Sequence, residues 1–587
     1  MHCFAVWAPR AHRVDIDLHT YDGVNRVAMD RSESGWWRHD GQVGPGTDYA
    51  FSVDGADPTP DPRSAWQPQG VHGPSRVFDP DAYRFENQSW RGPQDGAGVL
   101  GAVLYELHVG TFTAEGTLDA AADRLDELVD LGVDVVELMP VTAFPGRWGW
   151  GYDGVHPYAV HEPYGGPAAL QRFVDQCHGR GLGVCLDVVY NHLGPSGNYL
   201  SSYGPYFTDK HHTPWGQAVN LDDEGSPQVR RWIIDNALRW FRDFHIDALR
   251  LDAVHELKDD SPRHLLAQLS DETAALADAL ARPLALIAES DRNDPGTVEP
   301  TAQDGLGMTA QWNDDLHHSV HSLLTGERQG YYADFGSPSV LAKTLTRVFH
   351  HDGGWSRFRG AEWGRPVDPE VHDGRRFVGY LQTHDQVGNR AVGDRIGAQL
   401  TPGQRAIGAA LVLTSACTPM IFMGEEWAAS TPWQYFTDFD DLELGAAVRE
   451  GRRREFAQHG WDGEQVPDPQ DHATRDASVL RWAERTQGEH ARLLAWYRSL
   501  IAERRRTKEL TDGRLDDVSV ALADDGSWLV VRRGLLRLAC NLLAVPATVP
   551  VGGDTDVVVL AWEPATTQPG VGNVALGGHG VALLRAE

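Results

Sequence analysis

The chain of 587 residues is too long for a single hydrophobic core and indicates about three or four domains, unless one large barrel takes up more of it. Hydrophobic residues make up 41% and charged residues 23%, which is ordinary for a globular protein. The formal charge of −31, from 83 acidic against 52 basic residues, disfavours nucleic acid and anionic membranes as partners. A neutral ligand fits better, and 20 Trp, 16 Tyr and 18 Phe offer faces on which sugar rings can stack.

Signals for export, membrane insertion and cross-linking are weak. The N-terminal segment has no basic stretch leading into an apolar core and predicts no secretory signal. The apolar run 406–424 contains Thr414, Ser415 and Pro419, which favours a buried helix and strand over a membrane span. The five Cys are scattered and form no C-x-x-C pair, so neither a disulfide framework nor a zinc ribbon is indicated. We expect a cytoplasmic protein.

Residues 1–98 consist of short alternating segments between Gly, Pro and Asp turns. The alternation at 4–7, 14–18 and 49–53 is typical of strands in a small β-sandwich, which we interpret as a carbohydrate-binding-like module. Residues 57–75 are rich in Pro and Gly and predict an extended connector.

From residue 99 onward, apolar strands alternate with amphipathic helices. We expect strands at 103–109, 133–139, 184–189, 247–251, 284–288, 376–381 and 417–423, and helices at 118–131, 168–180 and 228–244. This order predicts an α/β fold with a parallel sheet covered on both faces. About eight repeats over roughly 400 residues favour a closed (β/α)₈ TIM barrel over an open dinucleotide-binding sheet. No G-x-G-x-x-G follows the first strand, which agrees with this choice.

The alternating pattern returns after about residue 512 and predicts a C-terminal all-β domain. The expected organisation is therefore a β-sandwich over 1–98, a catalytic barrel over 99–508 and a β-domain over 509–587. Within the barrel, an inserted loop region is expected around 190–227.

Polar side chains follow several predicted barrel strands, at the face where (β/α)₈ enzymes build their sites. Asp187 ends the third strand, Arg250 and Asp252 end the fourth, Glu289 follows the fifth, and Asp385 follows a late strand. A single residue of this kind is more often a helix cap or a loop ligand, and Glu289 alone would suit a cap of the turn after it. The joint pattern, with four carboxylates at one edge of the barrel, favours a catalytic site over helix caps or loop ligands.

The residue types suit glycoside cleavage by two carboxyl groups. Arg250 and Asp252 are two apart on a strand and point to the same side, so the guanidinium favours the carboxylate form that a nucleophile needs. Glu289 follows the apolar stretch LALIA, and desolvation there would raise its pKa and keep the proton of a general acid in place. Two such groups about 5 Å apart cleave with retention of configuration. Asp385 would be free to bind sugar hydroxyls and favour the distorted transition state.

These strand ends resemble a known group of enzymes. The motifs DVVYNH (187–192), LRLD (249–252), IAE (287–289) and HD (384–385) are similar to the four short signature regions of the α-amylase superfamily of glycoside hydrolases. The resemblance implies Asp252 as nucleophile, Glu289 as acid/base and Asp385 as transition-state stabiliser. It also implies residues that bind sugar. Those in the cleavage subsite are Tyr152, as aromatic platform, with Asp187, His192, Arg250 and His384. Those toward the leaving side are His255, Glu256 and Gln386.

Longer phrases resemble the trehalose-releasing branch of this superfamily, among them DPRSAWQPQGVHGPS, ELMPVTAFPGRWGWGYDGV and QWNDDLHHSVHSLLTGERQGYYADFG. The resemblance implies hydrolysis of the α-1,4-glucosidic bond next to the terminal trehalose of malto-oligosyltrehalose. It also implies functional pairing with a malto-oligosyltrehalose synthase. Branching relatives carry Glu after the late-strand Asp and debranching relatives carry Gly, whereas this chain has Gln386.

Two other functions stay open. The same carboxylates serve α-glucan branching, in which a sugar hydroxyl instead of water resolves the covalent intermediate. A non-catalytic carbohydrate-binding barrel is the remote alternative, because such proteins lose members of the catalytic set.

No cofactor and no metal are expected. Asn191 lacks an obvious acidic partner set for calcium, and His317 and His321 lack the Glu that a zinc helix carries after its first His. The helix around these His is expected to pack at the barrel rim or to offer a sugar contact from Asp314 or Asp315.

Overall fold

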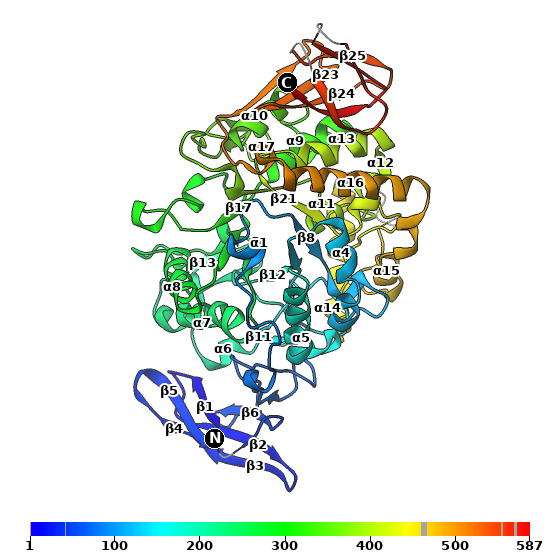
Figure 1. Ribbon diagram of the computed structural model, residues 1–587. Coiled ribbons are helices and arrows are strands. Elements are labelled where there is room, and N and C mark those ends of the chain that lie inside the picture. The colour runs from blue at the N-terminus through cyan, green and yellow to red at the C-terminus, as the bar shows by residue number, and fades with distance from the viewer. Residues whose placement is uncertain (1, 42, 459–465, 553–555, 569–571, 587) are drawn as a thin grey trace.

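A computed structural model describes residues 2–41, 43–458, 466–552, 556–568 and 572–586. Figure 1 shows the N-terminal strands at one end of the molecule, a barrel with its helices in the middle, and the C-terminal strands at the opposite end.

Two small antiparallel sheets form the N-terminal part. One has the strand order β1-β5-β4 and the other β3-β2-β6-β7. Buried side chains from both sheets, including Phe4, Val6, Ile16 and Phe51, make up their shared core. The bounds of the strands are β1 His2–Trp7, β2 Val14–Thr20, β3 Gly23–Ala28, β4 Asp30–Arg31, β5 Trp36–Gly41, β6 Asp48–Val53 and β7 Ser75–Arg76.

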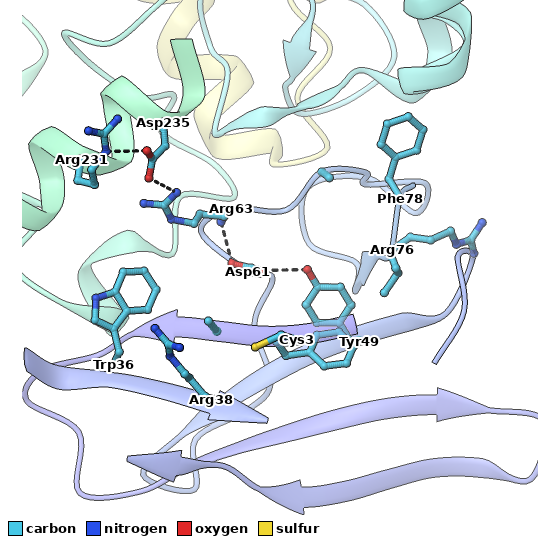
Figure 2. Close-up of a pocket in the computed structure, with 14 residues that line it drawn as sticks. Cys3, Trp36, Arg38, Tyr49, Asp61, Arg63, Arg76, Phe78, Arg231 and Asp235 are labelled. Carbon is cyan, nitrogen blue, oxygen red and sulfur yellow. Dashed lines mark hydrogen bonds and ion pairs between the residues drawn. The ribbon is translucent and has the colours of Figure 1, made fainter. Parts of the chain in front are cut away.

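The connector after β6 ties these sheets to the barrel, and Arg63 makes two of its polar contacts. Arg63 Nη1 donates to Tyr158 Oη at 3.0 Å and to Asp235 Oδ2 at 2.9 Å, both on the barrel side. Next to this contact is a cavity of about 410 Å³, whose lining includes Trp36 and Arg38 (Figure 2). Three of its four arginines, Arg63, Arg76 and Arg231, form ion pairs with acidic residues, and the lining comes from both the N-terminal sheets and the barrel side.

Eight parallel strands close into a barrel, which confirms the predicted (β/α)₈ fold. Their order around the barrel is β8-β9-β12-β15-β16-β17-β20-β21. Their bounds are β8 Leu104–Leu107, β9 Val135–Leu138, β12 Gly183–Val188, β15 Ala248–Leu251, β16 Ala285–Ala288, β17 Ala310–Trp312, β20 Phe377–Tyr380 and β21 Thr418–Phe422.

Side chains inside the barrel follow the two-residue period of its strands. Leu104, Val135, Cys185 and Ala248 belong to one buried cluster within the barrel. The residue two positions further along each strand points to the same interior, nearer the C-terminal face. Those residues are polar on all four strands, namely Glu106, Glu137, Asp187 and Arg250.

Helices surround the barrel and bury their apolar sides against the outer faces of the strands. The bounds of the longer ones are α5 Gly166–Gly179, α7 Ser226–Asp243, α8 Leu265–Leu280, α9 Asp314–Thr325, α10 Pro338–Arg347, α13 Pro402–Leu413, α14 Leu442–Gln458 and α16 Gly488–Arg506. The shorter ones are α1 Pro93–Gly96, α2 Val109–Phe112, α3 Leu118–Ala122, α4 Leu125–Leu131, α6 Leu200–Tyr203, α11 His384–Gly388, α12 Ile396–Gln399, α15 His472–Ala477 and α17 Lys508–Thr511.

Three elements of the structure differ from the prediction. The sixth barrel strand, β17, was not predicted, because it has three residues and includes the polar Gln311. The helix predicted over 118–131 is two helices, α3 and α4, because Arg124 takes a non-helical conformation between them. The strand predicted over 103–109 ends at Leu107, since Val109 begins α2.

The segment 190–227 carries α6 and a hairpin made of β13 Phe207–Thr213 and β14 Gly216–Val219. The apolar run 406–424 forms the end of α13 and then β21, as predicted. Among the described residues, none of the helices is both long and apolar enough to cross a membrane.

A five-stranded and a three-stranded antiparallel sheet form the C-terminal part, in the orders β22-β23-β24-β29-β26 and β25-β28-β27. The bounds are β22 Val518–Leu522, β23 Trp528–Arg533, β24 Leu536–Asn541, β25 Ala547–Pro550, β26 Asp556–Ala561, β27 Thr566–Gln568, β28 Asn573–Leu576 and β29 Val581–Ala586. Buried residues of both sheets, such as Val530, Val549 and Val574, pack in one cluster.

Candidate active site

Arg250 joins three carboxylates at the C-terminal face of the barrel. Its Nη1 lies 2.9 Å from Asp187 Oδ2 and 2.9 Å from Asp252 Oδ1, and its Nη2 lies 2.8 Å from Glu289 Oε2. The neighbouring strands β12, β15 and β16 bring these residues together. The Arg250 side chain has no exposed surface, and the ring of Trp312 lies 4.2 Å from its Cζ.

Asp252 is held in its charged form. Burial by itself would raise its pKa, but the charge of Arg250 and hydrogen bonds from Asn191 and Arg250 outweigh burial, so the pKa of Asp252 lies below its ordinary value. Asn191 Nδ2 donates to Asp252 Oδ2 at 2.7 Å. Asn191 therefore serves a carboxylate of the site.

Glu289 is held in its protonated form. Burial raises its pKa well above the ordinary value, and the charges of Asp252 and Asp385 raise it further despite the neighbouring Arg250. The backbone N–H of Ala253 donates to Glu289 Oε2 at 2.8 Å, which leaves the other oxygen to carry a proton. Two carboxyl groups at the ends of one guanidinium thus take opposite protonation states.

His384 and Asp385 begin α11, beside Tyr152. His384 Nε2 lies 2.8 Å from Tyr152 Oη and 3.5 Å from Asp385 Oδ1. Tyr152 Oη also donates to Asp187 Oδ2 at 2.7 Å. On its other side, His384 contacts the buried Glu106 of β8 through both the ring Nδ1 and the backbone N–H.

An exposed indole lies next to this group. Trp215, between β13 and β14, stacks on His192 with ring centroids 4.2 Å apart and an angle of 11°. Its side chain is 52% exposed, and His192 Nε2 contacts the carbonyl of Tyr152 at 3.0 Å. The inserted hairpin thus reaches the edge of the site.

Gln386 caps α11. Its Oε1 accepts hydrogen bonds from the backbone N–H of Thr383 at 2.8 Å and from the Thr383 hydroxyl, and its Nε2 donates to Asp314 Oδ1 at 3.3 Å. Tyr380 Oη donates to the same oxygen at 2.6 Å. Burial raises the pKa of Asp314 to about 6.

His255 and Glu256 lie to one side of the site, in the turn after β15. The ring of His255 is 3.9 Å from Asp291 Oδ1, and Glu256 Oε2 is 3.2 Å from Lys258 Nζ. The structure therefore brings Asp187, Arg250, Asp252, Glu289, Tyr152, His192, His384 and Asp385 into one group, with Gln386 beside it and His255 and Glu256 at its margin.

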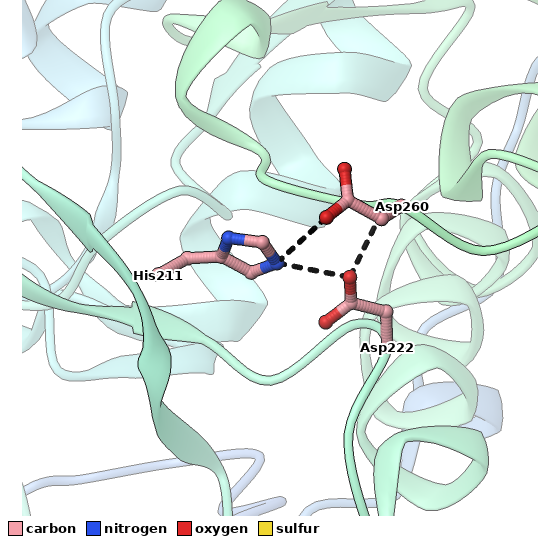
Figure 3. A group of neighbouring side chains, drawn as sticks. All are labelled: His211, Asp222 and Asp260. Carbon is pink, nitrogen blue, oxygen red and sulfur yellow. Dashed lines mark hydrogen bonds and ion pairs between the residues drawn. The ribbon is translucent and has the colours of Figure 1, made fainter.

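His211, Asp222 and Asp260 form the one group among the described residues whose ligand atoms lie close enough to share a metal ion (Figure 3). His211 Nε2 is 2.9 Å from Asp222 Oδ2 and 3.6 Å from Asp260 Oδ2. Lys210 Nζ lies 2.8 Å from the same oxygen of Asp222, so an ammonium group already supplies the positive charge. The group therefore does not fit a metal ion.

The His of α9 are engaged in packing. His317 contacts the carbonyl of Leu381 at 2.7 Å and the hydroxyl of Tyr332 at 2.9 Å, and His321 contacts Glu327 at 2.8 Å. These contacts hold α9 at the barrel rim, which is where the sequence places it.

Sequence reasoning missed Glu106 and Trp215. A signal for Glu106 was present, because a charged residue in the otherwise apolar strand 103–109 needs a buried partner. Its partner His384 lies 278 positions away, and neither pattern nor spacing points to it.

Comparison with known proteins places the chain in a family. The family described as alpha amylase, catalytic domain, matches residues 83–220. A malto-oligosyltrehalose trehalohydrolase from Arthrobacter ramosus is 51% identical, over 100% of this chain and 99% of the relative, and one from Mycobacterium tuberculosis is 50% identical over 99% of each. A solved structure of an alpha amylase candidate from Salmonella typhimurium superposes with a TM-score of 0.89 at 37% identity, and covers 99% of this chain and 97% of that one. The chain belongs to the malto-oligosyltrehalose trehalohydrolase family of alpha-amylase-type glycoside hydrolases.

Proposed function

We propose that this enzyme hydrolyses the α-1,4-glucosidic bond next to the terminal trehalose of malto-oligosyltrehalose, releasing trehalose and a shorter malto-oligosaccharide. The observation that carries the proposal is the full-length similarity to proteins named for this reaction. The site supports it, because one guanidinium gathers a charged Asp252 and a protonated Glu289.

The first step transfers the sugar to the enzyme. Asp252 attacks the anomeric carbon while Glu289 gives its proton to the glycosidic oxygen, so trehalose leaves and a covalent glycosyl ester forms. In the second step Glu289, now a carboxylate, takes a proton from water, whose oxygen attacks the same carbon and releases Asp252. Two inversions give net retention of configuration.

The remaining polar residues orient the sugar and stabilise the cation-like transition state. Asp385 is the most exposed of the three catalytic carboxylates, at 37%, and is placed to bind ring hydroxyls. Tyr152 provides the aromatic surface beneath the sugar in the cleavage subsite. The side chains that make polar contacts with this sugar are those of Asp187, His192, Arg250 and His384.

Selectivity for trehalose must come from the leaving side of the site. An α,α-1,1-linked pair bends differently from maltose, so a shaped pocket can accept one and reject the other. We place His255 and Glu256 on that side, with Gln386 acting through Asp314. Pairing with a malto-oligosyltrehalose synthase in the cytoplasm, which would supply the substrate, is part of the same proposal.

Chromatographic product analysis tests the proposal. Malto-oligosyltrehalose and the malto-oligosaccharide of equal length are incubated with the enzyme in parallel. Free trehalose from the first, with much slower cleavage of the second, supports the proposed reaction. Equal cleavage of both, or longer and branched products, would instead indicate an amylase or a branching enzyme.

A further inference from the structure

Glu106 lies inside the barrel, directly behind the catalytic group. It points inward from β8, and its side chain is 1% exposed. Both of its carboxylate oxygens are used by a single residue: Oε1 contacts the ring Nδ1 of His384, and Oε2 accepts the backbone N–H of His384 at 3.1 Å. This two-point contact fixes both the ring and the start of α11.

The hydrogen-bond partner on the far side of the ring sets the protonation of His384. Tyr152 Oη has one hydrogen, which it donates to Asp187 Oδ2 at 2.7 Å. Toward His384 Nε2, at 2.8 Å, this hydroxyl can therefore only accept, so Nε2 must carry a proton. Because Nδ1 faces the carboxylate of Glu106, both ring nitrogens act as donors.

We propose that Glu106 is a positioning residue for the reaction: its carboxylate holds His384 as an oriented imidazolium that donates its Nε2–H to Tyr152 and presents its positive charge to Asp385 and to the sugar in the cleavage subsite. The inference deepens the proposed function and rests on it for the part that concerns the sugar. The protonation of His384 itself requires only the contacts within the barrel.

The charges around His384 agree with this role. Burial lowers its pKa, and Arg250 of β15 acts in the same direction, but Glu106 and Asp385 outweigh them and raise the pKa to about 9. His108, at the end of β8, is a neutral neighbour whose pKa burial lowers to about 3. Asp187 of β12 reaches the ring through Tyr152. Without Glu106, burial and Arg250 would favour a neutral ring with a single N–H.

A charged ring serves the reaction in two ways. Its positive charge lies beside Asp385, whose Oδ1 is 3.5 Å from Nε2. It also makes the hydrogen bond from Nε2–H to Tyr152 Oη charge-assisted, and such a bond holds the aromatic platform under the sugar more firmly than one from a neutral imidazole. The charge of Glu106 thus acts on the substrate through His384 rather than by touching it.

The chain offers a matched control for Glu106→Gln. Glu137 of β9 pairs in register with Glu106, is equally buried and points into the same interior. Burial and the charge of Glu106 raise its pKa to about 8, so it is a neutral acid at pH 7 and Glu137→Gln exchanges one neutral group for another. A general effect of changing a buried Glu should appear in both variants, whereas loss of the charge behind His384 occurs only in the first.

The first measurement is the titration of His384 in enzyme labelled with ¹³Cε1- and ¹⁵N-histidine, with the signal identified by its loss in His384→Gln. We expect two protonated ring nitrogens at pH 7 in the wild type and in Glu137→Gln. In Glu106→Gln the pKa of His384 should fall to or below its ordinary value of about 6.5. A neutral His384 in the wild type overturns the proposal, even if Glu106→Gln fails to fold.

The second measurement is kcat/KM for trehalose release against pH. At pH 7 we expect Glu106→Gln to lose about 10- to 100-fold, the scale of one charge-assisted hydrogen bond, and Glu137→Gln to lose far less. The imidazolium is present below the pKa of His384 and is lost as the pH rises through it, so the alkaline limb should move to lower pH only in Glu106→Gln. Equal profiles for the two variants would refute the role of Glu106. Failure of the proposed function is separate, since it would change the products and leave the titration intact.

Discussion

Asp252 and Glu289 share one guanidinium, yet their pKa values move in opposite directions. Asp252 gains Asn191 and a full ion pair with Nη1, which together outweigh its burial. For Glu289, burial and the charges of the neighbouring acids raise the pKa by more than the charge of Arg250 lowers it. A nucleophile and an acid thus differ through their surroundings alone.

Glu289→Gln should reduce turnover at neutral pH by a factor of at least about 10², because the amide cannot protonate the leaving oxygen. Steady-state kinetics on malto-oligosyltrehalose measure this loss. An aryl α-glucoside with a good leaving group needs little protonation, so its glycosylation step should be slowed much less. Near-normal rates on both substrates would remove Glu289 from the role of acid.

Trp215→Ala should raise KM for malto-oligosyltrehalose about 10-fold or more and change kcat less, since an exposed ring beside the site contributes mainly to sugar binding. Tyr21→Ala is the matched control, because Tyr21 is an exposed aromatic residue of the N-terminal sheets. Initial-rate kinetics of both variants separate the two constants. A large fall in kcat with an unchanged KM would show that Trp215 acts through His192 on the chemistry instead.

At the scale of elements, the sequence predicts most barrel strands because buried parallel strands are continuous apolar runs, as in LALIA before Glu289. It does not predict β17, whose three residues include Gln311, which donates a hydrogen bond to the carbonyl of Ser290. The proposed catalytic residues were predicted because each follows a predicted strand and lies in a motif that resembles a signature region of the α-amylase superfamily. Contacts such as Glu106 with His384, or Trp215 with His192, depend on the closure of the barrel and on a hairpin fold that local pattern does not encode.

The β13–β14 hairpin is held by the contact of Lys210 with Asp222, and Lys210→Met should lower the thermal stability of the enzyme. Burial raises the pKa of Asp222, but hydrogen bonds from Lys210, His211 and the backbone N–H of Asp260 together lower it to about 2. The stabilisation is therefore present above the ordinary pKa of about 3.8 and is lost as the pH falls through about 2. Thermal unfolding at pH 7 and at pH 3 should therefore show a smaller difference between variant and wild type at pH 3.

The same experiment with EDTA tests the metal question. Because an ammonium group fills the cluster of His211, Asp222 and Asp260, the chelator should leave the unfolding temperature of the wild type unchanged. A clear drop with EDTA that calcium or zinc reverses would show that a metal ion occupies the cluster in solution.

At the scale of the whole molecule, the connector residue Arg63 joins the N-terminal sheets to the barrel through Tyr158 and Asp235. Arg63→Ala should lower the free energy of unfolding by about 1.5–3 kcal/mol, the range for hydrogen bonds to charged groups, with the lower end favoured because Asp235 is partly exposed. Chemical denaturation measures the change. Arg172→Ala, which removes a pair with Asp119 that is exposed on both sides, should stay within about 0.5 kcal/mol. Equal effects would show that Arg63 does not join the two parts. The domain boundaries at 98 and 508 remain predictions.

The single guanidinium of Arg250 also determines how many protons the site holds before substrate binds. One cation cannot neutralise three acids, so the interior keeps a hydrogen on Glu289 before any sugar arrives. The proton that trehalose needs on departure is therefore already stored in the resting protein. Binding of a neutral substrate therefore requires no proton uptake from the solvent. At the end of each catalytic cycle, the proton that Glu289 takes from the attacking water restores its protonated form.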